Sequence, residues 1–159
     1  MVNWIKFIVV FLLALTSVIT VTVLYNAGKP LSTANKTAIE SVLSSGQLAS
    51  VSSAESFNGT VPMVTVFGLD GDGEKTAVFV DQQSEDGFEE VKLADGISAE
   101  QAVANVKQEL TIKKVLHVTL GLEAEGPVWE VAFTSDNDKL NYVYVFFDNG
   151  QWWKRILNL

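Results

Sequence analysis

The pattern of apolar and polar residues divides the chain into one long apolar run and a longer region in which the two kinds alternate. The run covers residues 7–25, nineteen positions without a charged side chain. As an α-helix it would extend about 28 Å, which matches the hydrocarbon thickness of a bilayer. We therefore expect residues 1–28 to form a cytoplasmic tail and a transmembrane anchor.

The residues that flank the apolar run indicate its orientation. Lys6 and the terminal amine precede it, and the positive-inside bias places them in the cytoplasm, although Lys29 and Lys36 argue weakly the other way. A cleaved signal peptide is the alternative. The run is longer than a usual h-region, however, and a cut after Ala27 would place the bulky Tyr25 at the −3 position. We expect an uncleaved single-pass anchor in the cell membrane, with the C-terminal domains extracellular.

Apolar residues at helical spacing predict two helices after the anchor. At the second helix, Ser98 is a good N-cap, and Gln101 three residues later completes a capping box. Ala102 and Val106 then lie on one apolar stripe. A helix is therefore expected to begin directly after Ser98.

The first of the two helices has a similar stripe. Ala38 and Val42 lie on it, and Ser32 or Thr33 can cap its start. Gly46 suits the left-handed position that follows a helix end. Both helices are short and need a sheet to cover.

Eight strands are predicted from alternating apolar and polar residues, separated by turns rich in Asn, Asp and Gly. They are expected at residues 50–57, 63–69, 75–81, 88–93, 115–122, 128–134, 140–147 and 151–157. In the fifth strand, strict alternation would place Val115, His117 and Gly121 on one face.

The helices and strands repeat once along the chain. Ala38 and Val42 recur as Ala102 and Val106, and residues 61–66 and 77–80 recur as 126–131 and 142–145, at offsets of 64 and 65. We expect an α+β fold in which two units follow the anchor, residues 29–95 and 96–159. Each unit would pack one helix on an antiparallel β-meander, and units this small should pack on one another.

Charge and composition narrow the classes of partner. Residues 29–159 hold ten basic and nineteen acidic residues, a formal charge of −9. That balance argues against nucleic acid and against an anionic surface bound through bulk charge. The chain contains no cysteine, so an exported domain would depend on core packing without disulfides.

The sequence contains no recognisable catalytic, cofactor-binding or metal-binding set. Asp70, Asp72 and Glu74 have the spacing of a calcium loop, but Lys75 replaces its glycine and strands flank it, so a solvated turn is expected. His117 is the single histidine and has no nucleophile signal beside it. We therefore expect a protein that is not an enzyme.

Aromatic residues near the C-terminus are the candidate partner-binding residues. The segment 142–147 is apolar on both faces, so the strand with Tyr142 and Tyr144 should be covered by its helix and by the other copy or a partner. Trp152 and Trp153 are adjacent and should point to opposite faces. An interface and core packing both remain open for them, whereas Trp129 is expected in the core.

Several segments together resemble the PepSY pattern. They are Gly96 to Ala102 (GISAEQA), Trp129-Glu130-Val131, Tyr142-Val143-Tyr144-Val145, and Phe147 to Gln151 (FDNGQ). Their order behind one anchor is similar to the TseB-like (YpmB-like) cell wall elongation regulators of Gram-positive bacteria. The resemblance implies two cystatin-like, PepSY-like units in a regulator without cofactors that binds a penicillin-binding transpeptidase. The alternative that it leaves open is a PepSY-type inhibitor of an extracellular peptidase.

Overall fold

The computed structural model describes residues 2–27, 29–81 and 87–159, and it divides into two compact units, Met1–Ala34 and Asn35–Leu159. The first unit contains helix α1 (Val2–Ala27). Within it, Trp4–Leu24 is long and apolar enough to cross a membrane, with a mean hydropathy of 2.8. Such a helix at this place indicates a membrane anchor or a signal sequence.

Helix α2 (Lys29–Ser44) begins earlier than the sequence predicted. Ser32 and Thr33 lie inside the helix, so the predicted caps are wrong. Proline is tolerated in the first helical turn, where its missing N–H has no intrahelical partner, and Pro30 occupies that turn. The predicted end is confirmed, since Gly46 has a φ of 77° directly after the helix.

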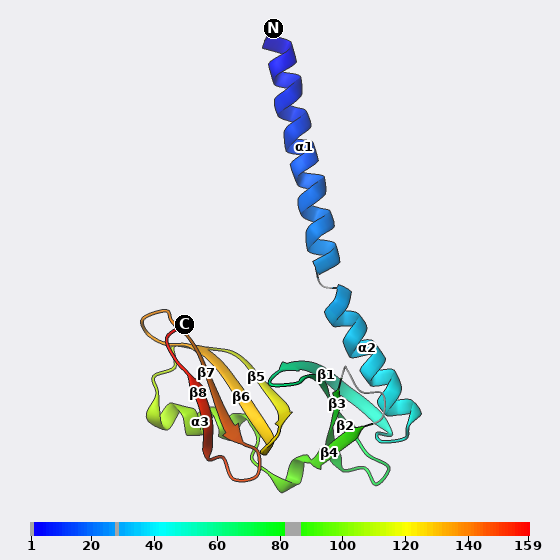
Figure 1. The fold of residues 1–159 in the computed structure, drawn as a ribbon, viewed down its shortest axis with the longest axis vertical. Coiled ribbons are helices and arrows are strands. Elements are labelled where there is room, and N and C mark those ends of the chain that lie inside the picture. The colour runs from blue at the N-terminus through cyan, green and yellow to red at the C-terminus, as the bar shows by residue number, and fades with distance from the viewer. Residues whose placement is uncertain (1, 28, 82–86) are drawn as a thin grey trace. The chain divides into compact units, whose positions relative to one another are not determined.

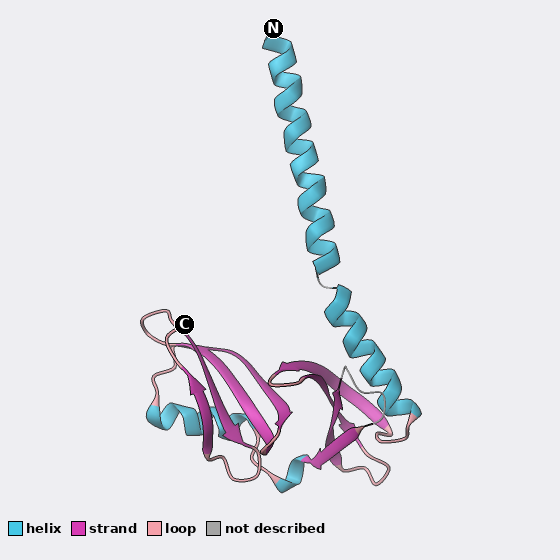
Figure 2. Ribbon diagram, in the orientation of Figure 1, coloured by secondary structure: helices cyan, strands magenta, loops and turns pink. Residues whose placement is uncertain are grey.

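Two antiparallel sheets follow, each with four strands in sequential order (Figure 1). The first sheet consists of β1 (Ser50–Asn58), β2 (Pro62–Leu69), β3 (Lys75–Asp81) and β4 (Phe88–Lys92). A short 3-10 turn, η1 (Leu93–Asp95), and helix α3 (Ala99–Glu109) lead to the second sheet. That sheet consists of β5 (Lys114–Glu123), β6 (Gly126–Thr134), β7 (Leu140–Phe146) and β8 (Trp152–Ile156) (Figure 2). The predicted α+β architecture, with a helix on each sheet, is confirmed.

The pairing registers show the duplication directly. Val66 pairs with Val78 in the first sheet, and Val131 pairs with Val143 in the second, both at the predicted offset of 65. The first strand of each sheet also carries a β-bulge at an offset of 64, at Ser52 in β1 and at Leu116 in β5. The two copies therefore share backbone irregularities as well as hydrophobic pattern.

The bulge in β5 corrects the predicted alternation of that strand. Val115 pairs with Phe133 and His117 pairs with Ala132, so the extra residue between them is Leu116. Because of it, Val115 and His117 point to opposite faces. Leu116 is left 46% exposed on the surface.

The first sheet is covered on both of its faces. The Asn35 side chain of α2 donates to the Ala54 carbonyl at 3.1 Å and accepts from the Ser56 hydroxyl at 3.1 Å, which places α2 on the face of Ser56. Val64, paired with Ser56, is fully buried beneath that helix. The opposite face carries Phe57, Met63, Thr65, Phe67 and Phe79, and it packs on the second copy.

The two sheets meet edge to face. Strand β5 contacts β1 and β2, and its backbone is held by side chains of the first sheet. The Thr65 hydroxyl donates to the Leu120 carbonyl at 2.6 Å, and the Leu122 N–H donates to the Met63 sulfur at 3.3 Å. The first sheet therefore closes the open edge of β5, where an exposed edge would invite unwanted strand pairing.

Helix α3 packs on one face of the second sheet. It begins with the predicted capping box, in which the Gln101 N–H donates to the Ser98 hydroxyl and the Ser98 N–H donates to the Gln101 side chain. Its stripe residues Ala102 and Val106 are fully buried. The Trp129 indole N–H of β6 donates to the Ile97 carbonyl at 2.9 Å just before α3, and the ring is buried, so the predicted core position of Trp129 is confirmed.

Candidate functional site

Strand β7 presents two different faces. Val145 pairs with Trp129, so it points to the α3 side, and Val143 shares that side and is fully buried. Tyr142, Tyr144 and Phe146 point to the other side. Tyr144 is buried, whereas Tyr142 and Phe146 remain partly exposed. The expected cover on both sides is therefore complete on the α3 side and incomplete on the other.

A third bulge, in β8, brings the neighbouring strand to this face. Tyr144 pairs with Lys154 and Val145 pairs with Trp152, so Trp153 is the extra residue. A bulge places two neighbouring side chains closer to one side than regular alternation allows. As a result, Trp153 and Lys154 both lie on the side of Tyr144.

We define the aromatic face as Tyr142, Tyr144 and Phe146 of β7 with Trp153 and Lys154 of β8. The Trp153 ring meets the Tyr144 ring edge to face, with centroids 5.9 Å apart, and it lies 6.4 Å from the Phe146 ring. The Lys154 ammonium lies 5.7 Å from the centroid of Tyr144 and 5.8 Å from that of Trp153. These contacts hold the rings and one cation in a fixed arrangement at the protein surface.

Trp152 is not part of this face. It points to the α3 side, where it packs against the core, and the Arg155 guanidinium lies 5.7 Å from its ring centroid. Of the four residues that the sequence proposed for partner binding, the structure brings together Tyr142, Tyr144 and Trp153. Phe146 and Lys154 belong with them but were not predicted. For Lys154 the reason is that regular alternation in β8 would have placed it with Trp152.

Acidic residues lie beside Tyr144, the buried member of the aromatic face. Burial, followed by the hydrogen bond to Glu130, raises the pKa of the Tyr144 hydroxyl above its ordinary value. Glu130 also lies 2.8 Å from the His117 ring nitrogen Nε2. From the first sheet, the half-buried Glu55 faces the same histidine, and burial raises the pKa of its carboxyl while the His117 charge opposes that rise.

The acidic turn that has the spacing of a calcium loop is held by its own hydrogen bonds. In the described part of the chain, no three His, Cys, Asp or Glu side chains are close enough to hold a metal ion. Asp70 uses its carboxylate within its own turn, where it accepts from the Asp72 and Glu74 N–H groups at 2.9 Å. These bonds lower the pKa of Asp70, that from Glu74 most, as is typical of an Asx turn.

Comparison with known proteins identifies both copies. Residues 37–81 match the model of the cell wall elongation regulator TseB-like domain. Residues 96–148 match the model of the peptidase propeptide and YPEB domain, PepSY. The two matches fall on the two sheets in chain order.

A solved structure with a similar fold is the YpmB protein from Bacillus subtilis. It is 28% identical, covers 70% of this chain and 87% of its own chain, and superimposes with a TM-score of 0.63. A search of curated proteins finds no significant match. The matches confirm the resemblance predicted from the motifs, and the chain is a TseB/YpmB-like protein with a PepSY domain.

Proposed function

We propose that this protein is a membrane-anchored, extracytoplasmic regulator of cell wall elongation that binds a penicillin-binding transpeptidase. The observation that carries the proposal is the TseB-like match in a chain that also has an apolar N-terminal helix. TseB-like and PepSY domains are regulatory or inhibitory, which supports a role without catalysis. The N-terminus would lie in the cytoplasm and both sheets outside the membrane.

The proposed mechanism is restraint of a partner near the membrane. An anchor confines the domains to the layer in which membrane-bound enzymes also diffuse, so it raises the effective concentration of each for the other. The aromatic face is the proposed contact surface. Tryptophan and tyrosine are enriched among residues that dominate binding energy, and here Trp153 and Tyr142 are partly exposed.

The test is crosslinking in intact cells followed by recovery of penicillin-binding proteins with the full-length chain. We expect Trp153→Ser or Lys154→Glu to reduce recovery about tenfold, since central interface residues contribute about 1–3 kcal/mol. Arg155→Glu is the matched control, because it changes a neighbouring cation that lies on the α3 side. Failure to recover any penicillin-binding protein, or equal recovery with Lys154→Glu and Arg155→Glu, would contradict the proposal.

The second candidate is an inhibitor of an extracellular peptidase. It is favoured by the PepSY match, whose model describes peptidase propeptides. The full-length protein in detergent micelles would then slow a purified secreted protease at micromolar concentration. The Trp153→Ser variant separates the mechanisms, because inhibition through the aromatic face would be lost and unspecific inhibition would persist.

A further inference from the structure

A groove separates the first sheet from the α3 side of the second sheet. It has a volume of about 540 Å³ and adjoins a second hollow of about 580 Å³. Both are lined by Lys75, Leu93, Ala99 and Trp129. Because Trp129 points to the α3 side of the second sheet, the groove and the aromatic face lie on opposite sides of that sheet.

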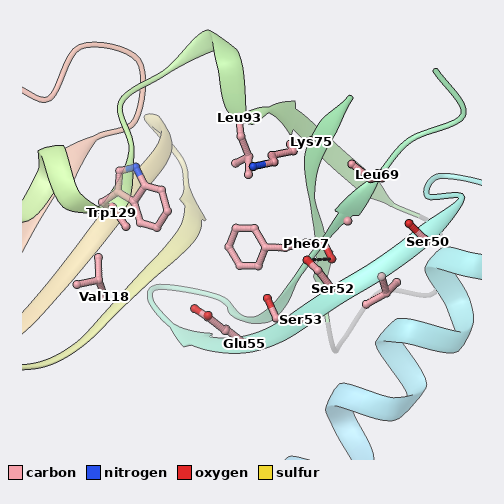
Figure 3. A pocket seen from close by; sticks show the side chains of 13 residues that line it. Ser50, Ser52, Ser53, Glu55, Phe67, Leu69, Lys75, Leu93, Val118 and Trp129 are labelled. Carbon is pink, nitrogen blue, oxygen red and sulfur yellow. Dashed lines mark hydrogen bonds between the residues drawn. The ribbon is translucent and has the colours of Figure 1, made fainter. Parts of the chain in front are cut away.

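The floor of the groove is apolar, whereas Ser50, Ser52, Ser53 and Glu55 line its β1 side. Figure 3 shows the Phe67 ring in the middle, with Trp129 and Val118 facing it from the second copy. Phe67 and Trp129 are only 8% and 6% exposed, so they form a rigid floor. Leu69, at the rim, is 41% exposed, so its substitution should change the stability of the fold little. The groove therefore has an apolar floor to which both copies contribute residues.

Among the described residues, one cation at the rim of the groove has no anionic partner. Lys92 and Glu74 pair with each other there. Within residues 2–27, 29–81 and 87–159, the Lys75 ammonium forms no ion pair, and Figure 3 places it beside Leu93 across Phe67 from Glu55. A carboxylate bound at this point would complement Lys75 without displacing an existing partner.

A bulge at Ser52 interrupts the edge of β1 beside the groove. The bulged Ser52 turns its hydroxyl toward the Phe67 carbonyl of β2 and donates to it at 3.0 Å. A bulge interrupts the regular ladder that an added strand requires. We therefore expect a ligand to be held mainly through its side chains.

From these observations we propose that the groove binds an extended segment of a partner protein that carries a large apolar side chain and, two positions away, a carboxylate. In an extended chain, residues i and i+2 point the same way and lie about 6.6 Å apart. The apolar side chain would rest on Phe67 and Trp129, and the carboxylate would pair with Lys75. This goes beyond the proposed function, because it adds a second recognition site with its own ligand chemistry.

The probe is a panel of capped nonapeptides in a Ser/Gly background, measured by NMR titration against the full-length protein in micelles. Each peptide carries Leu, Phe, Met or Trp two positions from Asp, and its counterparts carry Asn in place of Asp or Ser in place of the apolar residue. We expect at least one apolar-x-Asp peptide to bind about tenfold tighter than both of its counterparts. If no such peptide exceeds its counterparts, the proposal is overturned.

Variants locate the binding within the groove. Lys75→Glu should weaken the apolar-x-Asp peptide about tenfold and favour the peptide with Lys in place of Asp, whereas Lys114→Glu at an exposed strand start should change neither. Leu69→Gln should weaken binding, and the similarly exposed Leu116→Gln should not. Equal effects of Lys75→Glu and Lys114→Glu would overturn the proposal. The assay contains no penicillin-binding protein, so its failure is distinct from failure of the proposed function.

Discussion

The two sheets share one backbone plan but use the equivalent face differently. In the first sheet this face is formed by Phe57, Met63, Thr65, Phe67, Ala77 and Phe79. At offsets of 64 and 65, the second sheet has Gly121, Val128, Glu130, Ala132, Tyr142 and Tyr144. The first face is buried against the second copy, and the second is partly open to solvent.

The difference shows how a duplicated unit can pack asymmetrically. Phe57 and Gly121 occupy equivalent positions, and they also contact each other, because a Cβ on Gly121 would lie 2.2 Å from the Phe57 ring. A large residue in one copy and none in the other lets β5 approach the first sheet closely. The aromatic face of the second copy is then left free for recognition.

The largest effect on stability is expected from a substitution that removes this contact. Phe57→Ala should lower the free energy of unfolding by about 3–5 kcal/mol, because it removes a buried ring and leaves a cavity. Gly121→Ala alone should also destabilise, but in the Phe57→Ala background it should restore part of the loss. Chemical unfolding of the full-length protein followed by tryptophan fluorescence measures both. Additive losses in the double variant would contradict the contact.

The hydrogen bond from the first face to β5 gives the next effect. Thr65→Val should cost about 1–2 kcal/mol, because it leaves the buried Leu120 carbonyl without its partner. Thr134→Val, at a half-exposed strand end, is the control and should change stability by less than about 0.5 kcal/mol. If both variants unfold at the same denaturant concentration, the edge-to-face contact contributes nothing measurable.

The β2–β3 and β6–β7 turns sharpen the comparison further. They have the same backbone hydrogen bonds, and their left-handed residues are Gly73, with a φ of 81°, and Asp138, with a φ of 59°. A Cβ at Gly73 meets open space, so Gly73→Ala should cost about 1–2 kcal/mol through backbone strain alone. Gly73→Asp should cost less, because Asp tolerates this conformation. Thermal unfolding should therefore rank position 73 as Gly, Asp, Ala, with Gly71→Ala nearly neutral.

The smallest effect concerns Glu55, which faces His117 across the two sheets. Burial raises the pKa of its carboxyl in the folded state, so its stabilising contribution is complete at acid pH and is lost as the pH rises through the folded pKa. Glu55→Gln should therefore raise the free energy of unfolding at neutral pH, by less than about 1 kcal/mol because the group is half exposed, and hardly change it near pH 4. Glu125→Gln, on an exposed turn, is the control. A larger gain at pH 4 than at pH 7 would reverse the expected sign.

Local patterns in the sequence predicted most elements of the fold. The capping box at Ser98, the helix end at Gly46 and all eight strands lie where the spacing of apolar and turn residues placed them. The incorrect predictions concerned local features that hydrophobic periodicity does not specify. Helix α2 begins before Ser32, with Pro30 in its first turn, and the bulges at Leu116 and Trp153 break strict alternation.

The candidate site was only partly predictable. The sequence singled out four aromatic residues, Tyr142, Tyr144, Trp152 and Trp153. Three of them come together, whereas Trp152 points to the α3 side. The sequence could not add Lys154, because the bulge that turns this residue toward Tyr144 has no distinct pattern in the sequence.

By itself, the sequence determined the apolar helix, the capped α3, the eight strands and the doubling of one helix-and-sheet unit, because each depends on residues a few positions apart. Only the tertiary structure decided that the copies pack edge to face, with Thr65 reaching Leu120 and Phe57 lying on Gly121. It alone created the groove between Phe67 and Trp129. The physical reason is that two nearly equivalent sheets offer several ways to bury apolar area, and the choice among them rests on contacts between residues more than fifty positions apart.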